Sequence, residues 1–272
     1  MHTFVKEAEE ILDKEFPVLD HGFVRLVDYL GSDQRIVQSA RVSYGEGTKT
    51  YRQDKGLINY LMRNDHTSPF EQVVFTFHVK MPIFVARQWV RHRTARMNEI
   101  SGRYSVMKDE CYIPDRSVIA FQSEDNKQGR MSDPVDDETA KKVIDILKGA
   151  QERDFADYHE LLDMGIAREL SRVNLPLSLY TEFYWQMDLH NLFHFLQLRL
   201  DGHAQYEIRE YAKAIYSIVK IVTPMAAEAF ENFRLSSVTL SGREKEAVKA
   251  LLKEGSIPLE GREKELFMEK MK

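Results

Sequence analysis

The chain has 272 residues, 43% of them hydrophobic, and a formal net charge of -5, which suits one elaborated domain with a sizeable core. The acidic balance argues against a general nucleic-acid coat, because phosphate-backbone binding usually requires an excess of Lys and Arg over a whole face. Cys111 is the only cysteine, no apolar run is long enough to span a bilayer, and the N-terminus is acidic where a signal peptide would be apolar. We therefore expect a soluble cytoplasmic protein that binds neither membranes nor nucleic acids.

The N-terminal half alternates strand and helix patterns. Residues 22–31 are rich in Val and Leu between two glycines, which predicts a strand, and Ser32 predicts a capped helix after it. Helical spacing of apolar residues predicts another helix over 55–65, and alternating large and polar residues predict a strand over 73–80. Pro82 suits the first turn of a further helix, IFVARQWVRHR, which runs into an arginine-rich loop.

The C-terminal half begins with a polar excursion. Residues 106–136 lack periodicity, which indicates irregular structure. The segments after it predict a long helix over 137–164 ended by Gly165, a short helix over 166–174, a strand over 179–188, and two helices over 189–200 and 203–222. We assign 1–234 to one catalytic domain with an N-terminal leader, and 235–272 to a charged helical extension that starts with a capping-box pattern.

The arginine-rich segment has the composition of a phosphate site. Residues 91–105, RHRTARMNEISGRYS, hold four arginines around one glycine. Forked guanidiniums, a hydroxyl and close backbone approach at Gly102 suit a phosphate, whereas Gln88 and Glu99 add acceptors that a sugar and a base would use. We therefore expect a small phosphorylated ligand. The alternative is a solvated basic turn that pairs with surface carboxylates.

A second cluster is formed by histidines. His190 and His194 are four residues apart on a predicted helix and His203 follows, a spacing that could place imidazoles on zinc. Neither an HExxH sequence nor a thiolate pair accompanies them, so we predict no metal site. The sequence also lacks the GxGxxG, GxxxxGK[ST] and GxSxG patterns, which disfavours a Rossmann dinucleotide site, a P-loop and a hydrolase elbow.

Two single residues need an explanation of their own. Arg199 lies in an apolar run, where a guanidinium needs an anion, a polar ring edge, or an ion pair with Asp201 or Glu207. Cys111 has no basic neighbour in its own segment to lower the pKa of its thiol, so we expect a small residue, packed or exposed, without a reactive role.

Arg91-His92-Arg93, followed after seven residues by Ser101, resembles the RHR-x7-S signature of the flavin-dependent thymidylate synthases. Residues 66–89, LPLSLYTEFYW and LRLDGHAQYEIR resemble other parts of that family, so the resemblance covers about 22–232. It implies an α/β fold with a mixed sheet flanked by helices, no Rossmann site, and a homotetramer with active sites shared between subunits. The implied reaction converts dUMP to dTMP with carbon from 5,10-methylenetetrahydrofolate, hydride from reduced FAD, and NADPH as the reductant of the flavin.

The resemblance also implies site residues. The dUMP contacts would be Gln88, Arg91, Glu99, Ser101, Gly102, Arg103, Arg172 and Arg199. The FAD contacts would be Ser68, Glu71, Arg91, His92, Arg93, Glu99, Asp188, His190 and His194, with Ser43 a weaker candidate. Arg199 would be the catalytic residue, because a fixed cation near N3 of uracil stabilises the developing anion and makes C5 more nucleophilic. No protein nucleophile is required, so neither Ser101 nor Cys111 has a covalent role.

This sequence departs from the family pattern at one end of the flavin site. Many members have asparagine, arginine and asparagine at the positions of Asp188, His190 and His194. An aspartate near the pyrophosphate of FAD would repel it, so we expect Asp188 to face away or to contact the adenosine side. Two rival classes remain, a histidine-based metallohydrolase and a nucleic-acid-binding module that uses the arginine loop.

Overall fold

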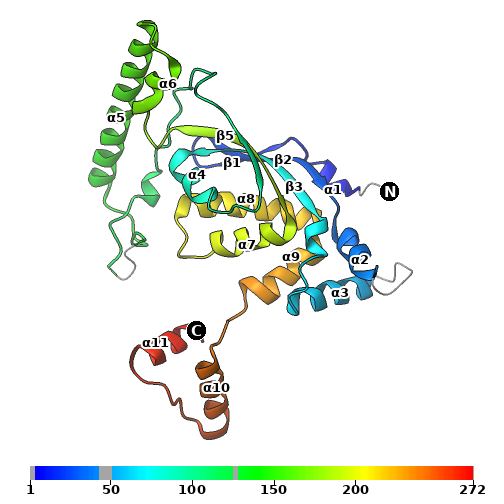
Figure 1. Cartoon of the computed structure of the whole chain (residues 1–272). Helices are drawn as coiled ribbons and strands as arrows, with labels where there is room; N and C mark the ends of the chain where they lie inside the picture. The colour runs from blue at the N-terminus through cyan, green and yellow to red at the C-terminus, as the bar shows by residue number, and fades with distance from the viewer. Residues whose placement is uncertain (1–3, 43–50, 125–127, 272) are drawn as a thin grey trace. The chain divides into compact units, whose positions relative to one another are not determined.

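The computed structural model describes residues 4–42, 51–124 and 128–271 (Figure 1). The chain divides into two compact units, Met1–Glu228 and Ala229–Lys272. This boundary lies a few residues before the one that composition suggested. Within the described ranges, no helix has both the length and the apolar character that a membrane crossing requires.

One five-stranded sheet forms the centre of the first unit within the described residues, in the order β1-β2-β3-β5-β4 (Figure 1). Every pairing is antiparallel. The strands are β1 (Glu15–Val18), β2 (Gly22–Leu30), β3 (Val74–Pro82), β4 (Arg96–Glu99) and β5 (Tyr180–Asp188). The strands predicted over 22–31, 73–80 and 179–188 are confirmed as β2, β3 and β5. The four-residue strands β1 and β4 were not predicted, because neither is long enough to show an alternating pattern.

Helices follow the predicted order, with differences at their ends. Those of the first unit are α1 (Lys6–Glu9), α2 (Asp33–Arg41), α3 (Tyr51–Arg63), η1 (Phe70–Gln72), α4 (Ile83–Trp89), η2 (Arg116–Val118), α5 (Asp137–Asp163), α6 (Arg168–Ser171), η3 (Arg172–Asn174), α7 (Leu189–Arg199) and α8 (Tyr206–Val222), and α9 (Pro224–Phe230) crosses into the second unit. The helix predicted over 83–93 ends at Trp89. The helix predicted over 166–174 divides into α6 and η3.

The core lies between the sheet and the helices α4, α7 and α8, which cover one of its faces (Figure 1). The alternation in β3 places Phe75, Phe77 and Val79 on this face, each with 0% exposure. Trp89 of α4 packs its ring 5.0 Å from Trp185 and 4.5 Å from Phe195, measured between ring centroids. This aromatic contact joins the end of α4 to β5 and α7, and so fixes the backbone from which the arginine-rich segment begins.

The predicted cap of α2 has a different partner. Ser32 occupies the N-cap position, but its side chain makes no capping hydrogen bond. The buried carboxylate of Asp33 instead accepts hydrogen bonds from the backbone N–H groups of Met225, at 2.8 Å, and Ala226, at 3.0 Å. Asp33 therefore satisfies donors at the start of α9 rather than donors of its own helix.

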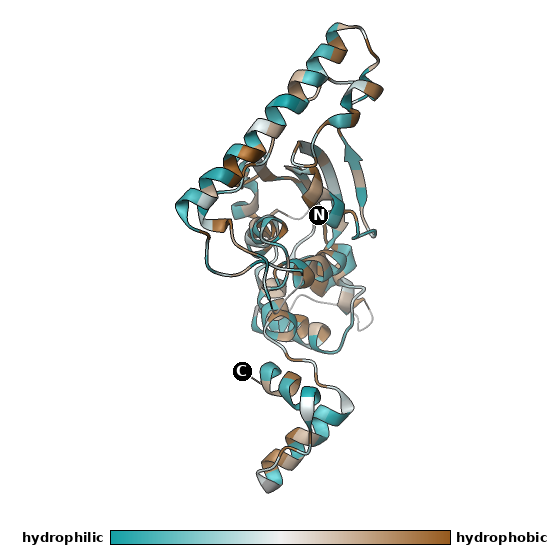
Figure 2. Cartoon of the chain, turned by 90° about the vertical axis from the view of Figure 1, so that its left-hand side faces the viewer, coloured by the Kyte–Doolittle hydropathy of each residue, from teal (hydrophilic) through white to brown (hydrophobic). Residues whose placement is uncertain are grey.

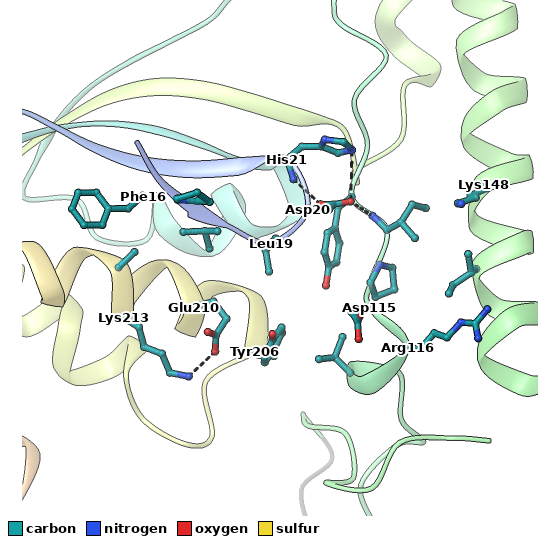
Figure 3. Close-up of a pocket in the computed structure, with 18 residues that line it drawn as sticks. Phe16, Leu19, Asp20, His21, Asp115, Arg116, Lys148, Tyr206, Glu210 and Lys213 are labelled. Carbon is teal, nitrogen blue, oxygen red and sulfur yellow. Dashed lines mark hydrogen bonds and ion pairs between the residues drawn. The ribbon is translucent and has the colours of Figure 1, made fainter. Parts of the chain in front are cut away.

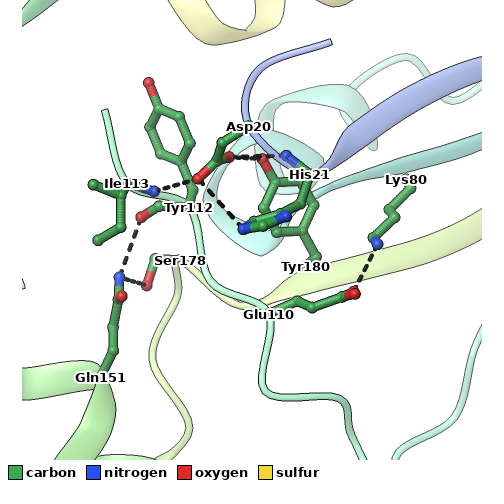
Figure 4. Close-up of polar contacts among 9 residues, drawn as sticks. All are labelled: Asp20, His21, Lys80, Glu110, Tyr112, Ile113, Gln151, Ser178 and Tyr180. Atoms are coloured by element: carbon green, nitrogen blue, oxygen red, sulfur yellow. Dashed lines mark hydrogen bonds and ion pairs between the residues drawn. The ribbon is translucent and has the colours of Figure 1, made fainter. Parts of the chain in front are cut away.

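The first part of the polar excursion is attached to the sheet and to α5. Asp20 accepts hydrogen bonds from the Tyr180 hydroxyl at 2.5 Å and from the Ile113 N–H at 2.9 Å (Figure 4). Gln151 of α5 donates to the Tyr112 carbonyl at 3.1 Å and to the Ser178 hydroxyl at 3.0 Å. The absence of periodicity in this segment therefore reflects irregular backbone held by side chains. Helix α5 is largely hydrophilic along its length (Figure 2).

The second unit has a small core of its own. Ala247, Leu259 and Phe267 are buried together, and the helices of this unit are η4 (Glu231–Leu235), α10 (Gly242–Glu254) and α11 (Gly261–Lys270). The capping box predicted at the start of α10, between Ser241 and Glu244, is confirmed. The pentapeptide Gly-Arg-Glu-Lys-Glu opens α10 and occurs again at the start of α11.

Candidate active site

The RHR sequence lies in a turn directly after α4. The predicted helix was expected to include Arg91, His92 and Arg93, but the last helical residue is Trp89, and the chain then turns toward β4. Arg91 and Arg93 are exposed and His92 is half-buried. Because residues 91–93 are not helical, the exposed guanidiniums of Arg91 and Arg93 are not constrained to one helix face.

Arg199, at the end of α7, is bonded to this turn. Its Nε donates to Nε2 of His92 at 3.0 Å, and its terminal nitrogen donates to the backbone carbonyl of Gln88 at 3.3 Å. The ion pairs considered from the sequence do not form, because Asp201 pairs with His203 and Glu207 pairs with Arg130. The guanidinium is thus positioned by neutral acceptors, which leaves its positive charge uncompensated by these contacts.

His92 is held in its neutral form. Burial lowers the pKa of His92 to about 4, and the adjacent positive charge of Arg199 lowers it in the same direction, with a further contribution from His194. An Arg Nε–H can only donate, so Nε2 of the ring accepts and the ring proton resides on Nδ1. Burial also lowers the pKa of Arg199, but a guanidinium remains charged at neutral pH.

Glu99 lies on a strand where a loop was expected. Residues 96–99 pair with β5 as the edge strand β4, with Glu99 opposite Phe183. The buried Thr181 hydroxyl donates to the Glu99 carboxylate at 2.5 Å. All four residues of β4 are exposed, so this strand presents its side chains and one free edge away from the core. The signature sequence did not reveal this strand because its apolar and polar residues do not alternate.

Ser101, Gly102 and Arg103 form a compact turn beside Arg172. The Ser101 hydroxyl accepts from the Arg103 N–H at 3.3 Å. A Cβ added to Gly102 would lie 3.0 Å from Sδ of Met107 and 3.1 Å from Cδ of Arg172. The turn therefore requires glycine for close approach to the Arg172 side chain, and it brings together four of the residues that the sequence assigned to dUMP.

Two neighbouring cationic side chains pair with protein acceptors, one with a carboxylate and one with a backbone carbonyl. Nε of Arg103 lies 3.3 Å from the Glu169 carboxylate, and both side chains are more than half exposed. Arg168 donates to the Tyr104 carbonyl at 3.1 Å, which ties the start of α6 to the same turn. An exposed pair of this kind contributes little to stability, about 0 to 1 kcal/mol, so a phosphate can replace the carboxylate at small cost.

Residues assigned to FAD lie on several elements, two of which, η1 and α7, pack together. Ser68 and Glu71 are exposed residues at η1, and η1 packs on α7, with the rings of Phe70 and Phe193 6.3 Å apart. The exposed His194 ring lies 6.1 Å from that of His92. Segments far apart in sequence thus meet where the RHR turn begins. Ser43 lies outside the described residues.

Asp188 has a structural partner. Its carboxylate accepts from the Asn191 N–H at 3.0 Å and from the Asn191 side-chain amide at 2.7 Å, and it caps α7. Its charge therefore faces the positive end of the α7 dipole. His190 follows in the first turn of α7 and is half-buried. The Asp188 carboxylate is thus engaged by the first turn of α7.

A separate cavity of the first unit is lined by none of these residues. This cavity of about 1140 Å³ lies among the β1–β2 turn, the segment 112–118, α5 and α8 (Figure 3). Among the described residues, no group of three or more His, Cys, Asp or Glu could hold a metal ion. Cys111 is buried, and burial raises the pKa of its thiol to about 11.

Comparisons with known proteins agree on one family. The family model described as thymidylate synthase complementing protein matches residues 25–225. A flavin-dependent thymidylate synthase of Treponema denticola is 62% identical over 261 residues, which cover 96% of this chain and 98% of the relative. That of Treponema pallidum is 56% identical over 271 residues, which cover 100% and 89%. A UMP/dUMP methylase, PolB from Streptomyces cacaoi, solved with 5-Br dUMP, has a TM-score of 0.74 at 33% identity and covers 82% of this chain and 100% of its own.

The fold and these matches define an enzyme of the methyltransferase class. The chain belongs to the family of flavin-dependent thymidylate synthases, as its RHR-x7-S sequence implied. The predicted α/β fold with a helix-flanked sheet is confirmed. The sheet itself was expected to be mixed, but all its strand pairings are antiparallel. The family reaction brings FAD as cofactor, a folate as carbon donor and NADPH as reductant.

Proposed function

We propose that this chain converts dUMP to dTMP with carbon from 5,10-methylenetetrahydrofolate, hydride from FAD and electrons from NADPH. The observation that carries the proposal for this site is the contact between Arg199 and His92. A guanidinium held by a neutral ring is a fixed positive charge without an ion-pair partner of its own in these contacts. Such a charge suits the uracil ring, which becomes electron-rich as C5 attacks the methylene carbon.

The dUMP molecule is proposed to bind across two groups of residues. Arg103 and Arg172, with the backbone at Gly102, would hold the phosphate, because forked guanidiniums and a side-chain-free backbone approach its oxygens closely. Gln88 and Arg199 would contact the base. Arg91, Glu99 and Ser101 are proposed to complete the contacts with the nucleotide.

The residues around the RHR turn fit a flavin. FAD, when bound, supplies the hydride that completes the methyl group. The two exposed guanidiniums of Arg91 and Arg93 suit its pyrophosphate, and the Asp188 charge is already engaged by Asn191 and so does not oppose it. The other proposed FAD contacts are Ser68, Glu71, His92, Glu99, His190 and His194.

A homotetramer with shared sites is part of the proposal. Large apolar side chains are exposed around the proposed dUMP residues, including Tyr104 at 79%, Val173 at 71% and Leu177 at 65%. Large apolar side chains exposed close to a proposed site suit a surface that another chain covers. A second copy placed there would shield the reacting atoms from water. The oligomeric state in solution, measured by light scattering, tests this part independently of activity.

The reaction is tested with purified protein loaded with FAD. NADPH should bleach the flavin absorbance under anaerobic conditions, and dTMP should form once dUMP and methylenetetrahydrofolate are present. Arg199→Gln should retain FAD and lose dTMP formation. A protein that neither takes up FAD nor binds dUMP would overturn the proposal, and metal analysis and oligonucleotide binding would then test the two rival classes.

A further inference from the structure

A chain of hydrogen bonds connects Gln88 to a buried carboxylate. The side-chain amide of Gln88 donates to Oε1 of Gln205, and Nε2 of Gln205 donates to Oε2 of Glu207 at 2.7 Å. Glu207 is 4% exposed, whereas Gln88 is only half-buried. The chain therefore runs from the interior of the protein to a residue proposed to touch dUMP.

The carboxylate at the inner end has fixed partners. Its other oxygen accepts from the Tyr112 hydroxyl at 3.3 Å and from Arg130 at 3.4 Å, and the Arg130 guanidinium also lies 4.9 Å from the centre of the Tyr206 ring. Burial and the negative charge of Glu207 raise the pKa of Tyr112, so its hydroxyl remains a donor. Arg130 belongs to the polar excursion, which thereby supplies the cation for this buried anion.

The carboxylate of Glu207 fixes which group donates and which accepts in each of these hydrogen bonds. An ionised carboxylate can only accept hydrogen bonds, so Gln205 must turn its NH₂ toward Glu207 and its oxygen toward Gln88. Gln88 must then use one N–H for Gln205, which leaves its own oxygen and its second N–H for a ligand. Gln205 is the N-cap residue of α8, yet its side chain makes no capping hydrogen bond. Its amide bonds instead to Gln88 and Glu207.

We propose that Gln205 and Glu207 are positioning residues that orient the Gln88 amide for dUMP, with Arg130 of the excursion holding Glu207. The inference rests on the proposed function, because it needs dUMP at Gln88. It gives the excursion a role, since that segment acts on the nucleotide site through Tyr112 and Arg130, which both bond to Glu207.

The test compares three changes in the full-length, FAD-loaded protein. Gln205→Met removes the amide donor and acceptor at similar side-chain size. Glu207→Gln replaces an acceptor by an amide that can also donate, so the direction of the hydrogen bonds is no longer fixed. The third variant carries both changes. Glu210→Gln is the matched control, because it also neutralises a carboxylate on α8, one that pairs with Lys213 at 2.7 Å. The dUMP dissociation constant is read from the change in flavin absorbance, and FAD affinity and unfolding midpoint are measured alongside.

Each single change should weaken dUMP binding about tenfold while FAD affinity stays within about twofold. The dUMP affinity of the double variant should also fall about tenfold, not a hundredfold, because both changes break the same series of hydrogen bonds. The control should match the unmodified protein. Unchanged dUMP affinity in Gln205→Met would overturn the inference, as would additive losses or a parallel loss of FAD affinity. Failure of the proposed function would appear separately, as an unmodified protein that binds no dUMP.

Discussion

Nε of Arg199 donates a 3.0 Å hydrogen bond to Nε2 of His92. The two residues are 107 positions apart, and their contact joins the end of α7 to the turn after α4. Arg199→Lys keeps the charge but removes the Nε donor and the planar fork. We expect dTMP formation to fall at least about tenfold with FAD still bound, because the charge loses its fixed position. Arg209→Lys, on neighbouring α8, should retain full activity, and an equal loss there would contradict this reading.

His92 should make stability depend on acid pH. Its folded pKa of about 4 lies below the ordinary 6.5, so the unfolded chain binds the proton more readily. The stabilisation is present above pH 6.5 and is lost as the pH falls toward 4. Relative to His92→Gln, the protein should lose about 2 kcal/mol over this interval, allowing for partial exposure. Urea unfolding of both proteins at pH 7.5 and pH 4.5 measures the difference, and a constant difference would refute it.

Asp33 should have the opposite pH dependence. Burial raises the pKa of Asp33 to about 6 from 3.8, and the two backbone hydrogen bonds oppose this only in part. Its contribution is therefore complete below pH 3.8 and is lost as the pH rises through 6. Compared with Asp33→Asn, the protein should lose up to about 3 kcal/mol between pH 4 and pH 7. Unfolding curves for the pair at these two pH values give the sign, and a rise with pH would exclude it.

Gly102 should control the position of Arg172. In Gly102→Ala the new methyl group would lie 3.1 Å from Cδ of Arg172, so the guanidinium must shift. We expect dUMP affinity to fall at least about fivefold, while the free energy of unfolding changes by about 1 kcal/mol or less, because the crowded neighbours are flexible side chains. Gly56→Ala, in open space on α3, is the control and should increase stability by about 0.5 to 1 kcal/mol.

Glu169 should compete with the nucleotide phosphate for Arg103. Glu169→Gln removes the charge of an exposed pair, so the free energy of unfolding should change by less than about 1 kcal/mol. Binding of dUMP should become equal or tighter, because no carboxylate then has to be displaced. Isothermal titration at two salt concentrations measures this, and weaker binding would show that Glu169 supports the site instead.

The sequence predicted the long elements well, because periodicity is a property of the segment itself. Strands β2, β3 and β5 and helices α5, α7 and α8 each have enough residues to show their pattern. The helix after Pro82 was predicted four residues too long, since arginine and histidine are compatible with a helix and nothing in the sequence marks its end at Trp89. The short β4 depends on pairing with β5, which is a contact between distant segments.

For the candidate site, the sequence identified residues but not their partners. The RHR-x7-S spacing led to Arg91 and Ser101, whereas nothing in the sequence connected Thr181 with Glu99 or Gln205 with Gln88. A buried threonine in a strand and a glutamine before a helix are common, so their meaning appears only through Glu99 and Gln88.

The bond from Asp33 to the start of α9 spans 192 positions. During synthesis, the N-terminal strands emerge long before β5 and α9, and β3 has no partner on its second edge until β5 is made. A growing chain therefore holds an open strand edge and apolar side chains in solution from the synthesis of β3 until that of β5. The first unit can complete its fold only after α9 is made, which makes the nascent chain a candidate for chaperone protection.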